Sequence, residues 1–368
     1  MKILMLSDIN SPHTQKWATA LVRKGVEVSV FSMSEPSKDW YLKENIQLIN
    51  SAAIGKNKFK GNSFSKISYL KLLPQLKKAI ADFQPQIVHA HYASSYGFLG
   101  ALSGFHPYII SAWGSDVMDF PKRNAINRKI LKYNFKKADK ILATSETLIK
   151  AISKFSTKPI ERVYFGIDSE CFKPMEVKRI FPEDALVIGT IKSLEEIYGI
   201  DILIKAFKKI VENKKDENLK LLIVGGGSKE KEYKMLVNEL RLNDSVVFSG
   251  RVEYDLVAEY HNMIDIFVNI SRNESFGVAV LEASSCEKPV IVSNVGGLTE
   301  VVKHGETGLL VERENINDTA KAIEVLLKDK SLRKQMGLNG RKFVQQNYEF
   351  EKNVDRTIEI YRQLLEKN

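Results

Sequence analysis

Cysteine is scarce in the sequence, and long hydrophobic runs are missing from it. The 368 residues include two cysteines, Cys171 and Cys286, which lie far apart along the chain. They offer no disulfide framework and no metal-ligand spacing, which fits a reducing compartment. No run approaches 18 uninterrupted apolar residues, and the apolar run MKILMLSDI at the N-terminus is too short for a secretory signal. We therefore expect a cytoplasmic protein without a membrane-spanning segment.

Two motifs that would identify other functions are also missing. No Asp-x-Asp occurs, and the six histidines do not have the spacing of metal ligands, so the sequence predicts no metal site. No Gly-x-Gly-x-x-Gly is followed by an acidic residue about twenty positions later, which leaves a nicotinamide or flavin site unsupported. We therefore expect neither a metal ion nor a redox cofactor.

The sequence does contain ample apolar material and an uneven distribution of charge. Apolar residues make up 44% of a chain whose length exceeds that of one growing core, which predicts two domains. The net charge is +10, and residues 1–170 hold 25 Lys and Arg against 13 Asp and Glu. A basic half attracts anionic partners such as phospholipid head groups, lipid diphosphates or nucleic acid. A solvated Lys-rich surface without a partner explains the asymmetry equally well.

Short apolar runs alternate with helix-compatible segments through both halves of the chain. Strands are predicted in the runs KILMLSDI, VEVSVFSM, IQLINSA, QIVHAHYA, YIISAW, KILATS, ALVIGTIK, LKLLIVGGG, SVVFSG, IDIFVNIS and PVIVSNVGG. This alternation predicts parallel strands joined by right-handed crossovers and covered by helices on both faces. The architecture begins again near Leu186, so the sequence predicts an α/β protein with two doubly wound parallel sheets.

The domain boundaries follow from composition. Residues 1–168 form the predicted N-terminal Rossmann-like domain and residues 186–350 the C-terminal one, with a linker near residues 166–185 that contains two prolines and little periodicity. Residues 351–368 have helical Val, Ile and Leu spacing. This last helix could cap the second domain or cross back to the first.

The most informative stretch is SRNESFGVAVLEASSCEKPVIVSNVGGLTEVV, residues 271–302. It joins a strand end to a helix start, and Gly277 allows close approach of the backbone to a ligand. The free N–H groups of the first helical turn and the positive end of the helix dipole suit a diphosphate. Glu282, about a turn and a half further on, would repel a phosphate and is better suited to ribose hydroxyls. Glu274 can reach a sugar.

This stretch resembles the signature of the retaining glycosyltransferases of family 4, the glycosyl transferases group 1, which share the GT-B fold. The likeness includes both glutamates, the helix between them, and the Gly296-Gly297 turn followed by Glu300, and it extends over nearly the whole chain. The resemblance implies two Rossmann-like domains that face each other across a cleft. The N-terminal domain would bind the acceptor and the C-terminal domain the nucleotide-sugar donor.

The resemblance also implies roles for single residues of the donor site. Glu274 would face the donor sugar, and Glu282 would bind the ribose. Backbone amides near Ser275, Phe276 and Gly277 would bind the diphosphate.

Two further strand ends lie where family members build the nucleotide pocket. Gly225 opens a glycine triplet after LKLLIV, and Arg251 and Val252 follow SVVFSG, where the backbone usually contacts the base in the family. A glycine triplet after a strand also serves as a tight turn, so both interpretations stay open for Gly225.

The sequence departs from the family after the first strand of the C-terminal domain. The family carries an Arg and a Lys-Gly pair there, both in contact with the diphosphate, whereas this chain has Thr190 near the Arg position and Tyr198 before Gly199. We predict that Lys192 supplies the positive charge instead. A strand-end surface lysine is the alternative.

A second departure lies in SAWGSDV, where Trp113 stands at a position that is often histidine in the family. Tryptophan can pack on a sugar ring but carries no proton. Asp116 matches the family's aspartate in this loop, and His13, after the first strand, is the better placed of two candidate histidines. The other, His91, could equally be structural. Glu274, Lys192, His13 and Asp116 are therefore the predicted catalytic residues.

The function that the resemblance implies is metal-independent transfer of a sugar, with retention at the anomeric carbon, from a nucleotide diphosphate-sugar. Uridine diphosphate is the expected carrier, and cell-surface polysaccharide, lipopolysaccharide or glycolipid synthesis the expected process. A lipid-linked or glycan acceptor would bring the enzyme to the inner face of the cell membrane. The alternatives are a nucleotide-sugar epimerase or another GT-B enzyme and, more remotely, a nucleic-acid-binding protein that uses the basic segment 121–140, which has no recognised nucleic-acid motif.

Overall fold

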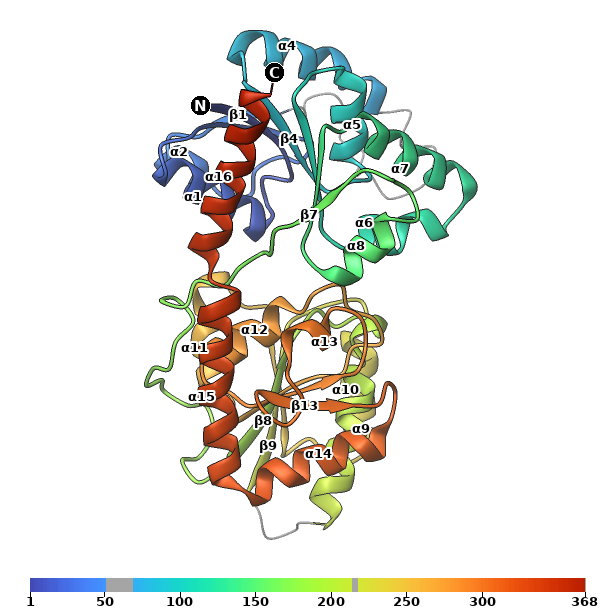
Figure 1. Cartoon of the computed structure of the whole chain (residues 1–368). Helices are drawn as coiled ribbons and strands as arrows, with labels where there is room; N and C mark the ends of the chain where they lie inside the picture. Colours follow the sequence, from blue (N-terminus) through green and yellow to red (C-terminus); the bar gives the residue numbers. More distant parts are fainter. Residues whose placement is uncertain (51–68, 214–217, 368) are drawn as a thin grey trace. The chain divides into compact units, whose positions relative to one another are not determined.

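The computed structural model describes residues 1–50, 69–213 and 218–367, and these divide into two compact units. Unit 1 comprises Met1–Phe165 and Glu351–Asn368, and unit 2 comprises Gly166–Phe350. Each unit contains a parallel sheet with helices packed around it (Figure 1). Among the described residues, no helix is both long and apolar enough to cross a membrane.

Unit 1 has, within its described residues, a seven-stranded parallel sheet in the order β3-β2-β1-β4-β5-β6-β7. The chain order reverses between β1 and β4, the point at which open α/β sheets bind ligands. The strands are β1 (Lys2–Leu6), β2 (Glu27–Ser32), β3 (Gln47–Asn50), β4 (Ile87–His91), β5 (Tyr108–Ala112), β6 (Lys140–Ala143) and β7 (Ile160–Arg162). The helices are α1 (Pro12–Arg23), α2 (Trp40–Lys43), α4 (Leu73–Phe83), α5 (Tyr96–Ser103), α6 (Ser115–Met118), η2 (Phe120–Lys122), α7 (Ala125–Lys137), α8 (Glu146–Ile152) and α16 (Phe350–Glu366).

Unit 2 repeats this topology with six parallel strands among its described residues, in the order β10-β9-β8-β11-β12-β13. Its reversal lies between β8 and β11. The strands are β8 (Leu186–Ile191), β9 (Leu219–Val224), β10 (Val246–Gly250), β11 (Ile266–Asn269), β12 (Val290–Ser293) and β13 (Gly308–Val311). The helices are η3 (Glu196–Tyr198), α9 (Ile200–Asn213), α10 (Glu230–Glu239), η4 (Tyr254–Leu256), α11 (Val257–Met263), α12 (Val278–Ser285), α13 (Leu298–Val301), α14 (Ile316–Lys328) and α15 (Lys330–Asn347).

The predicted apolar runs form the strands, and the prediction of two doubly wound parallel sheets is confirmed. The last two residues of the run at 46–52 lie outside the described part of the chain. The core strands are buried on both faces because helices cover both sides, as in β9, where Leu221, Leu222 and Ile223 are all fully buried. Each unit therefore has a hydrophobic core of its own.

Residues 166–185, the segment that we predicted as a linker, pack within unit 2. Phe172 is buried, and its carbonyl accepts hydrogen bonds from Ser285 Oγ at 2.5 Å and Arg341 Nη1 at 3.1 Å. Ser169 Oγ donates to Glu349 Oε2 at 2.7 Å. Prolines and low periodicity marked an irregular segment, but side-chain contacts from distant helices hold it in place.

Helix α16, drawn in red in Figure 1, packs against unit 1. Tyr361 is fully buried, and its hydroxyl lies 2.7 Å from His89 Nδ1 on β4. At the start of the helix, Lys24 pairs with Glu351 at 3.2 Å and with Asp355 at 2.8 Å. The C-terminal residues thus complete the core of the N-terminal unit.

Candidate active site

The carboxyl edge of the unit 2 sheet brings Lys192 and Glu274 together. Lys192 directly follows β8 and Glu274 lies shortly after β11, and these two strands pair at the point where the chain order reverses. Lys192 Nζ lies 2.5 Å from Glu274 Oε2, and the side chains are only 13% and 12% exposed. The sequence placed these residues 82 positions apart. Topology makes them neighbours where an open α/β sheet binds its ligand.

The surroundings keep the Lys192 side chain cationic. Burial lowers the pKa of Lys192, but the attraction of the Glu274 carboxylate, with smaller contributions from Tyr198 and Glu282, outweighs it and leaves the pKa raised. The Tyr198 ring, at the position where the family usually has a lysine, lies 4.5 Å from Lys192 Nζ in a cation–π contact. Ser271 Oγ lies 3.4 Å from Glu274 Oε2. A fixed positive charge therefore stands beside a carboxylate in a site with little access to water.

The glycine triplet after β9 holds the backbone that carries Lys192. A Cβ on Gly225 would come within 1.9 Å of Lys192 O, and one on Gly227 within 2.4 Å of Leu194 O. Gly225 also has a φ of +139°, which side-chain-bearing residues rarely adopt. The triplet serves close packing between two strand-end loops, and Gly226 has no atom nearer than 3.6 Å to such a Cβ.

The backbone before α12 is shaped by a second glycine pair. A Cβ on Gly296 would meet Glu274 O at 2.2 Å, and one on Gly297 would meet Ser275 O at 2.4 Å. Gly297 N donates to Glu274 O at 3.0 Å. The Gly296-Gly297 turn after β12 therefore fixes the peptide that presents Glu274.

The start of α12 has the geometry of an anion site in its backbone. Gly277 is the N-cap with a φ of +112°, and the first N–H groups of a helix have no partner within the helix. Phe276 is 1% exposed, with its ring 5.8 Å from that of Tyr348, so its side chain anchors the loop and only its backbone can serve a ligand. Ser275 is half-buried beside it.

The remaining donor-site residues lie along the same edge of unit 2. Glu282 is 7% exposed, and its Oε2 lies 3.6 Å from His261 Nε2. Arg251 is exposed and Val252 half-buried directly after β10. Gly225 N donates to Gly250 O at 2.8 Å, which joins this strand end to the glycine triplet. The residues predicted for unit 2 thus follow carboxyl ends of neighbouring strands, apart from Glu282, which lies within helix α12.

The sequence analysis did not identify Arg272, which bonds to the backbone of the segment that carries Tyr198. Its guanidinium contacts both Asp201 oxygens at 3.0 and 2.9 Å and Glu314 at 2.9 Å, and it donates to the carbonyl of Glu196. These bonds raise its pKa, first through Asp201. Arg272 thus holds the backbone of the segment Glu196–Tyr198 through Glu196 and Ile197. The sequence could not predict these contacts, because the partners of Arg272 lie on distant segments of the chain.

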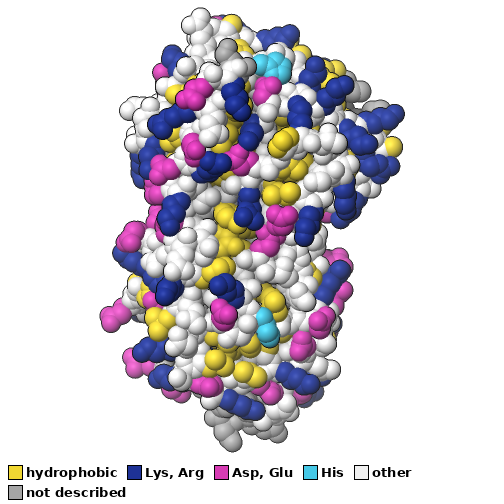
Figure 2. All heavy atoms as spheres, in the orientation of Figure 1, with side chains coloured by type: hydrophobic (Ala, Val, Ile, Leu, Met, Phe, Trp, Pro, Cys, Tyr) yellow, Lys and Arg dark blue, Asp and Glu magenta, His cyan; other side chains and the backbone are white. Residues whose placement is uncertain are grey.

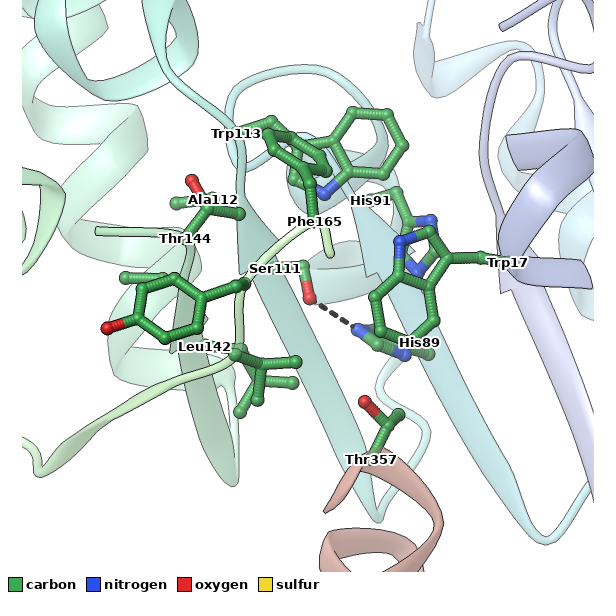
Figure 3. A pocket seen from close by; sticks show the side chains of 13 residues that line it. Trp17, His89, His91, Ser111, Ala112, Trp113, Leu142, Thr144, Phe165 and Thr357 are labelled. Atoms are coloured by element: carbon green, nitrogen blue, oxygen red, sulfur yellow. Dashed lines mark hydrogen bonds between the residues drawn. The ribbon is translucent and has the colours of Figure 1, made fainter. Parts of the chain in front are cut away.

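Unit 1 has a small cavity, here called the aromatic cavity, at the carboxyl ends of β4, β5 and β6 (Figure 3). The volume open to the centre of a water molecule is about 20 Å³, which is room for a bound water or a single polar group. Two polar atoms in its wall, His91 Nδ1 and Thr144 Oγ1, are buried without a hydrogen-bond partner in the described part of the chain. The other lining residues are Trp17, His89, Ser111, Ala112, Trp113, Leu142, Ala143, Val163, Tyr164, Phe165 and Thr357.

His13 belongs to an aromatic cluster beside this cavity. Its ring stacks on Phe165 at 4.2 Å and meets Trp113 edge-on at 5.6 Å. His91 lies 4.9 Å from Trp113, and its pKa is well below the ordinary value because of burial and the nearby His89 and His13. The structure brings both candidate histidines to the tryptophan that replaces the family's histidine.

Asp116 lies in α6, three residues after Trp113, and is fully buried. Its carboxylate accepts backbone N–H bonds from Ala93 at 2.5 Å, Gly114 at 2.8 Å and Trp113 at 3.2 Å. Burial raises its pKa to about 6, against the opposing effect of these hydrogen bonds. These bonds hold the backbone around Trp113, and the catalytic role of Asp116 stays a prediction.

Within the described residues, no group of three or more His, Cys, Asp or Glu is arranged to hold a metal ion. The sites that do stand out are the Lys192–Glu274 edge of unit 2 and the aromatic cavity of unit 1.

Comparisons with known proteins match both halves of the chain. Residues 173–343 match the model of the glycosyl transferases group 1, and residues 2–145 match that of a glycosyl transferase 4-like family. An uncharacterised glycosyltransferase of Methanocaldococcus jannaschii is 32% identical over 308 residues, 82% of each chain. The capsular polysaccharide biosynthesis glycosyltransferase CapM of Staphylococcus aureus is 33% identical over 229 residues, 61% of this chain and 56% of that protein.

Solved structures agree on the fold. Sucrose-phosphate synthase from Thermosynechococcus elongatus superposes with a TM-score of 0.89 at 23% identity over 100% of both chains. HepE of Anabaena, solved in complex with UDP and glucose, gives 0.80 at 18% identity over 99% of this chain and 100% of that one. The two parallel-sheet units have the GT-B fold. The chain is a glycosyltransferase and belongs to the group 1 glycosyltransferases of family 4.

Proposed function

We propose that the chain transfers a sugar from a UDP-sugar to an acceptor hydroxyl with retention at the anomeric carbon and without a divalent ion. The observation that carries this proposal is the buried Lys192–Glu274 pair at the point where the unit 2 sheet reverses its order. The residues around the pair supply one group for each part of such a donor. The N-terminal turn of α12 suits the diphosphate, and Glu282 suits the ribose.

The chemistry follows from charge. The bond between the anomeric carbon and the phosphate oxygen breaks, and its electron pair leaves with UDP. Lys192 and the N–H groups at the start of α12 stabilise the negative charge that develops there. The acceptor oxygen attacks from the same face, and its proton passes to the departing phosphate. Glu274 faces the sugar and supports the positive charge that develops on its ring.

The identity of the donor and the biological process are proposed from similar proteins. HepE, which has the same fold, was solved with UDP and glucose, and CapM acts in capsular polysaccharide biosynthesis by its name. We propose UDP as the carrier, a cell-surface glycan as the product, and residues 1–168 as the acceptor-binding part. The aromatic cavity of unit 1 supports the last point, because Trp113 and Phe165 offer flat apolar walls beside unpaired polar atoms.

A nucleoside diphosphate is expected to raise the Tm of the protein, and Glu282→Ala is expected to remove most of that shift. Binding to the folded state alone stabilises it by RT ln(1 + [L]/Kd), about 2.7 kcal/mol at a hundredfold excess over Kd. Loss of the ribose contact weakens binding and so reduces the shift. Scanning calorimetry with UDP, GDP and ADP, in EDTA, measures this, with Glu312→Gln at an exposed site as control.

Two outcomes of that experiment, and an assay of the products, separate the proposal from its alternatives. If only GDP or only ADP raises the Tm, that nucleotide and not UDP is the carrier of the donor sugar. A shift with single-stranded RNA and none with any diphosphate would contradict the proposal in favour of nucleic-acid binding. An epimerase would bind UDP-sugar but convert it to an isomer, whereas a transferase releases UDP only when an acceptor is present.

The exposed face of α7 supports binding at an anionic membrane surface, where lipid-linked acceptors reside. Figure 2 shows Lys and Arg side chains gathered over this part of unit 1. Ile126 on the same face is 61% exposed, whereas Leu131 and Phe135 on the opposite face are fully buried. The basic residues, here called the α7 basic face, are all exposed and comprise Arg128, Lys129, Lys132, Lys136 and Lys137.

Wild-type protein is expected to sediment with vesicles that contain anionic lipid and not with neutral ones. Each Lys or Arg near such a surface contributes about 1 kcal/mol, so Lys129→Gln, Lys132→Gln and Lys136→Gln together should release most of the protein. The matched control replaces three exposed lysines of unit 2 by glutamine: Lys321, Lys328 and Lys330. Equal binding to neutral and anionic vesicles would contradict membrane binding through the α7 basic face. An equal loss of vesicle binding in the control variant would contradict it as well.

A further inference from the structure

A buried imidazole stands directly behind Glu282. His261 on α11 is fully buried, and its Nε2 lies 3.6 Å from Glu282 Oε2 on α12. This distance is within reach of an ion pair but beyond an ordinary hydrogen bond. The contact joins two helices of unit 2, so it does not depend on unit 1.

Two phenylalanine rings also lie close to His261. Its ring centroid lies 5.2 Å from that of Phe267 and 6.0 Å from that of Phe172. Both ring nitrogens are buried without a hydrogen-bond partner among the residues that the structure describes. A buried donor without a partner carries a desolvation cost, so such a group calls for an explanation.

Packing alone does not explain a histidine at this position. A phenylalanine would fill the aromatic pocket without an unpaired polar atom. Of the two ring nitrogens, Nε2 is the one with a polar group in reach, because it lies 3.6 Å from the carboxylate that we propose for ribose binding. Oε1 of Glu282 is then the oxygen left for the ligand.

We infer that His261 is a positioning residue for Glu282, an inference that rests on the function proposed above. When ribose hydroxyls bind Glu282, the carboxylate closes the 3.6 Å gap and accepts the Nε2–H hydrogen bond. That bond fixes the carboxylate orientation, so that the other oxygen meets the hydroxyls. The desolvation cost of the free protein is relieved only in the bound state, which favours binding of a nucleoside over a ligand without ribose.

The test is isothermal titration of UDP into single variants of the full chain. His261→Phe keeps the aromatic packing and removes the donor. It is expected to weaken UDP binding about tenfold, the lower end of what a hydrogen bond to a charged group contributes. His261→Gln places an amide N–H near the position of Nε2 and is expected to bind UDP as the wild type does. Inorganic pyrophosphate, which lacks ribose, should bind all three proteins equally.

A double-mutant cycle with Glu282→Ala isolates the coupling. In that background His261→Phe should cause no further loss of UDP affinity, because the carboxylate it orients is gone. In turnover assays His261→Phe should raise the donor KM and leave kcat within about twofold. Calorimetric Tm values establish that each variant is folded.

The outcomes separate this inference from the proposed function. If wild-type protein binds no nucleoside diphosphate, the proposed function and this inference both fail. If UDP binds and Glu282→Ala weakens it, but His261→Phe binds like the wild type, only the role of His261 is overturned. Equal weakening by His261→Phe and His261→Gln, or equal loss of pyrophosphate binding, would show a packing role and overturn it as well.

Discussion

Glu274→Gln is expected to lower turnover at least a hundredfold while UDP binds as tightly as before or several-fold more tightly. The amide keeps the shape of the side chain but removes the charge that faces the donor sugar, and loss of one such group typically costs 10²–10³ in kcat. The same change frees Lys192, whose Nζ lies 2.5 Å from Glu274 Oε2. Without its ion pair with Glu274, Lys192 is expected to interact more strongly with the diphosphate.

Opposite effects on kcat and on UDP affinity would be the signature of this arrangement. Steady-state kinetics and UDP titration on the same preparation measure both, and Glu312→Gln at an exposed site of unit 2 serves as control. Full activity in Glu274→Gln would place the reacting sugar elsewhere. Parallel losses of turnover and of UDP affinity would mean that Glu274 holds the nucleotide.

Lys192→Ala is expected to reduce turnover about ten- to a hundredfold, because a charged hydrogen bond contributes about 1.5–3 kcal/mol and each 1.36 kcal/mol is a factor of ten. It should also lower the stability of the free protein, since Glu274 is only 12% exposed and loses its cationic partner. Lys192→Arg restores the charge and should recover part of the turnover.

The stability effect has a control of its own. Lys192→Ala combined with Glu274→Gln removes both charges, so the double variant should have a higher Tm than Lys192→Ala alone, although it is inactive. Thermal unfolding and initial rates measure the two effects separately. Unchanged kinetics in Lys192→Ala would move the charge-neutralising role to another residue.

The strands could be predicted from the sequence because strands buried on both faces are nearly all apolar. β7 and β13, short strands at sheet edges, were missed, although β3, which is also a short edge strand, was predicted from its apolar run. Parallel strands place their carboxyl ends at one edge of a sheet, but the sequence did not predict that β8 and β11 are neighbours. The Lys192 hypothesis depended on the family resemblance.

The contacts that orient the site could not be predicted in the same way. Tyr198 beneath Lys192, Arg272 on Asp201 and His261 behind Glu282 each join segments whose spacing has no period. Asp116 shows what a motif cannot predict. The motif predicted a role for this residue, but whether a carboxylate meets substrate or backbone amides depends on its burial, which a motif does not state.

The membership of α16 in unit 1 sets an order of events during synthesis. Unit 2 is one continuous segment, whereas the Tyr361–His89 contact spans 272 residues. On the ribosome, unit 2 can fold as soon as it emerges, but the hydrophobic seat of Tyr361 in unit 1 stays open until the last helix is released. The N-terminal unit, although made first, is finished last, and its exposed seat is the natural target for chaperones and for aggregation in the growing chain.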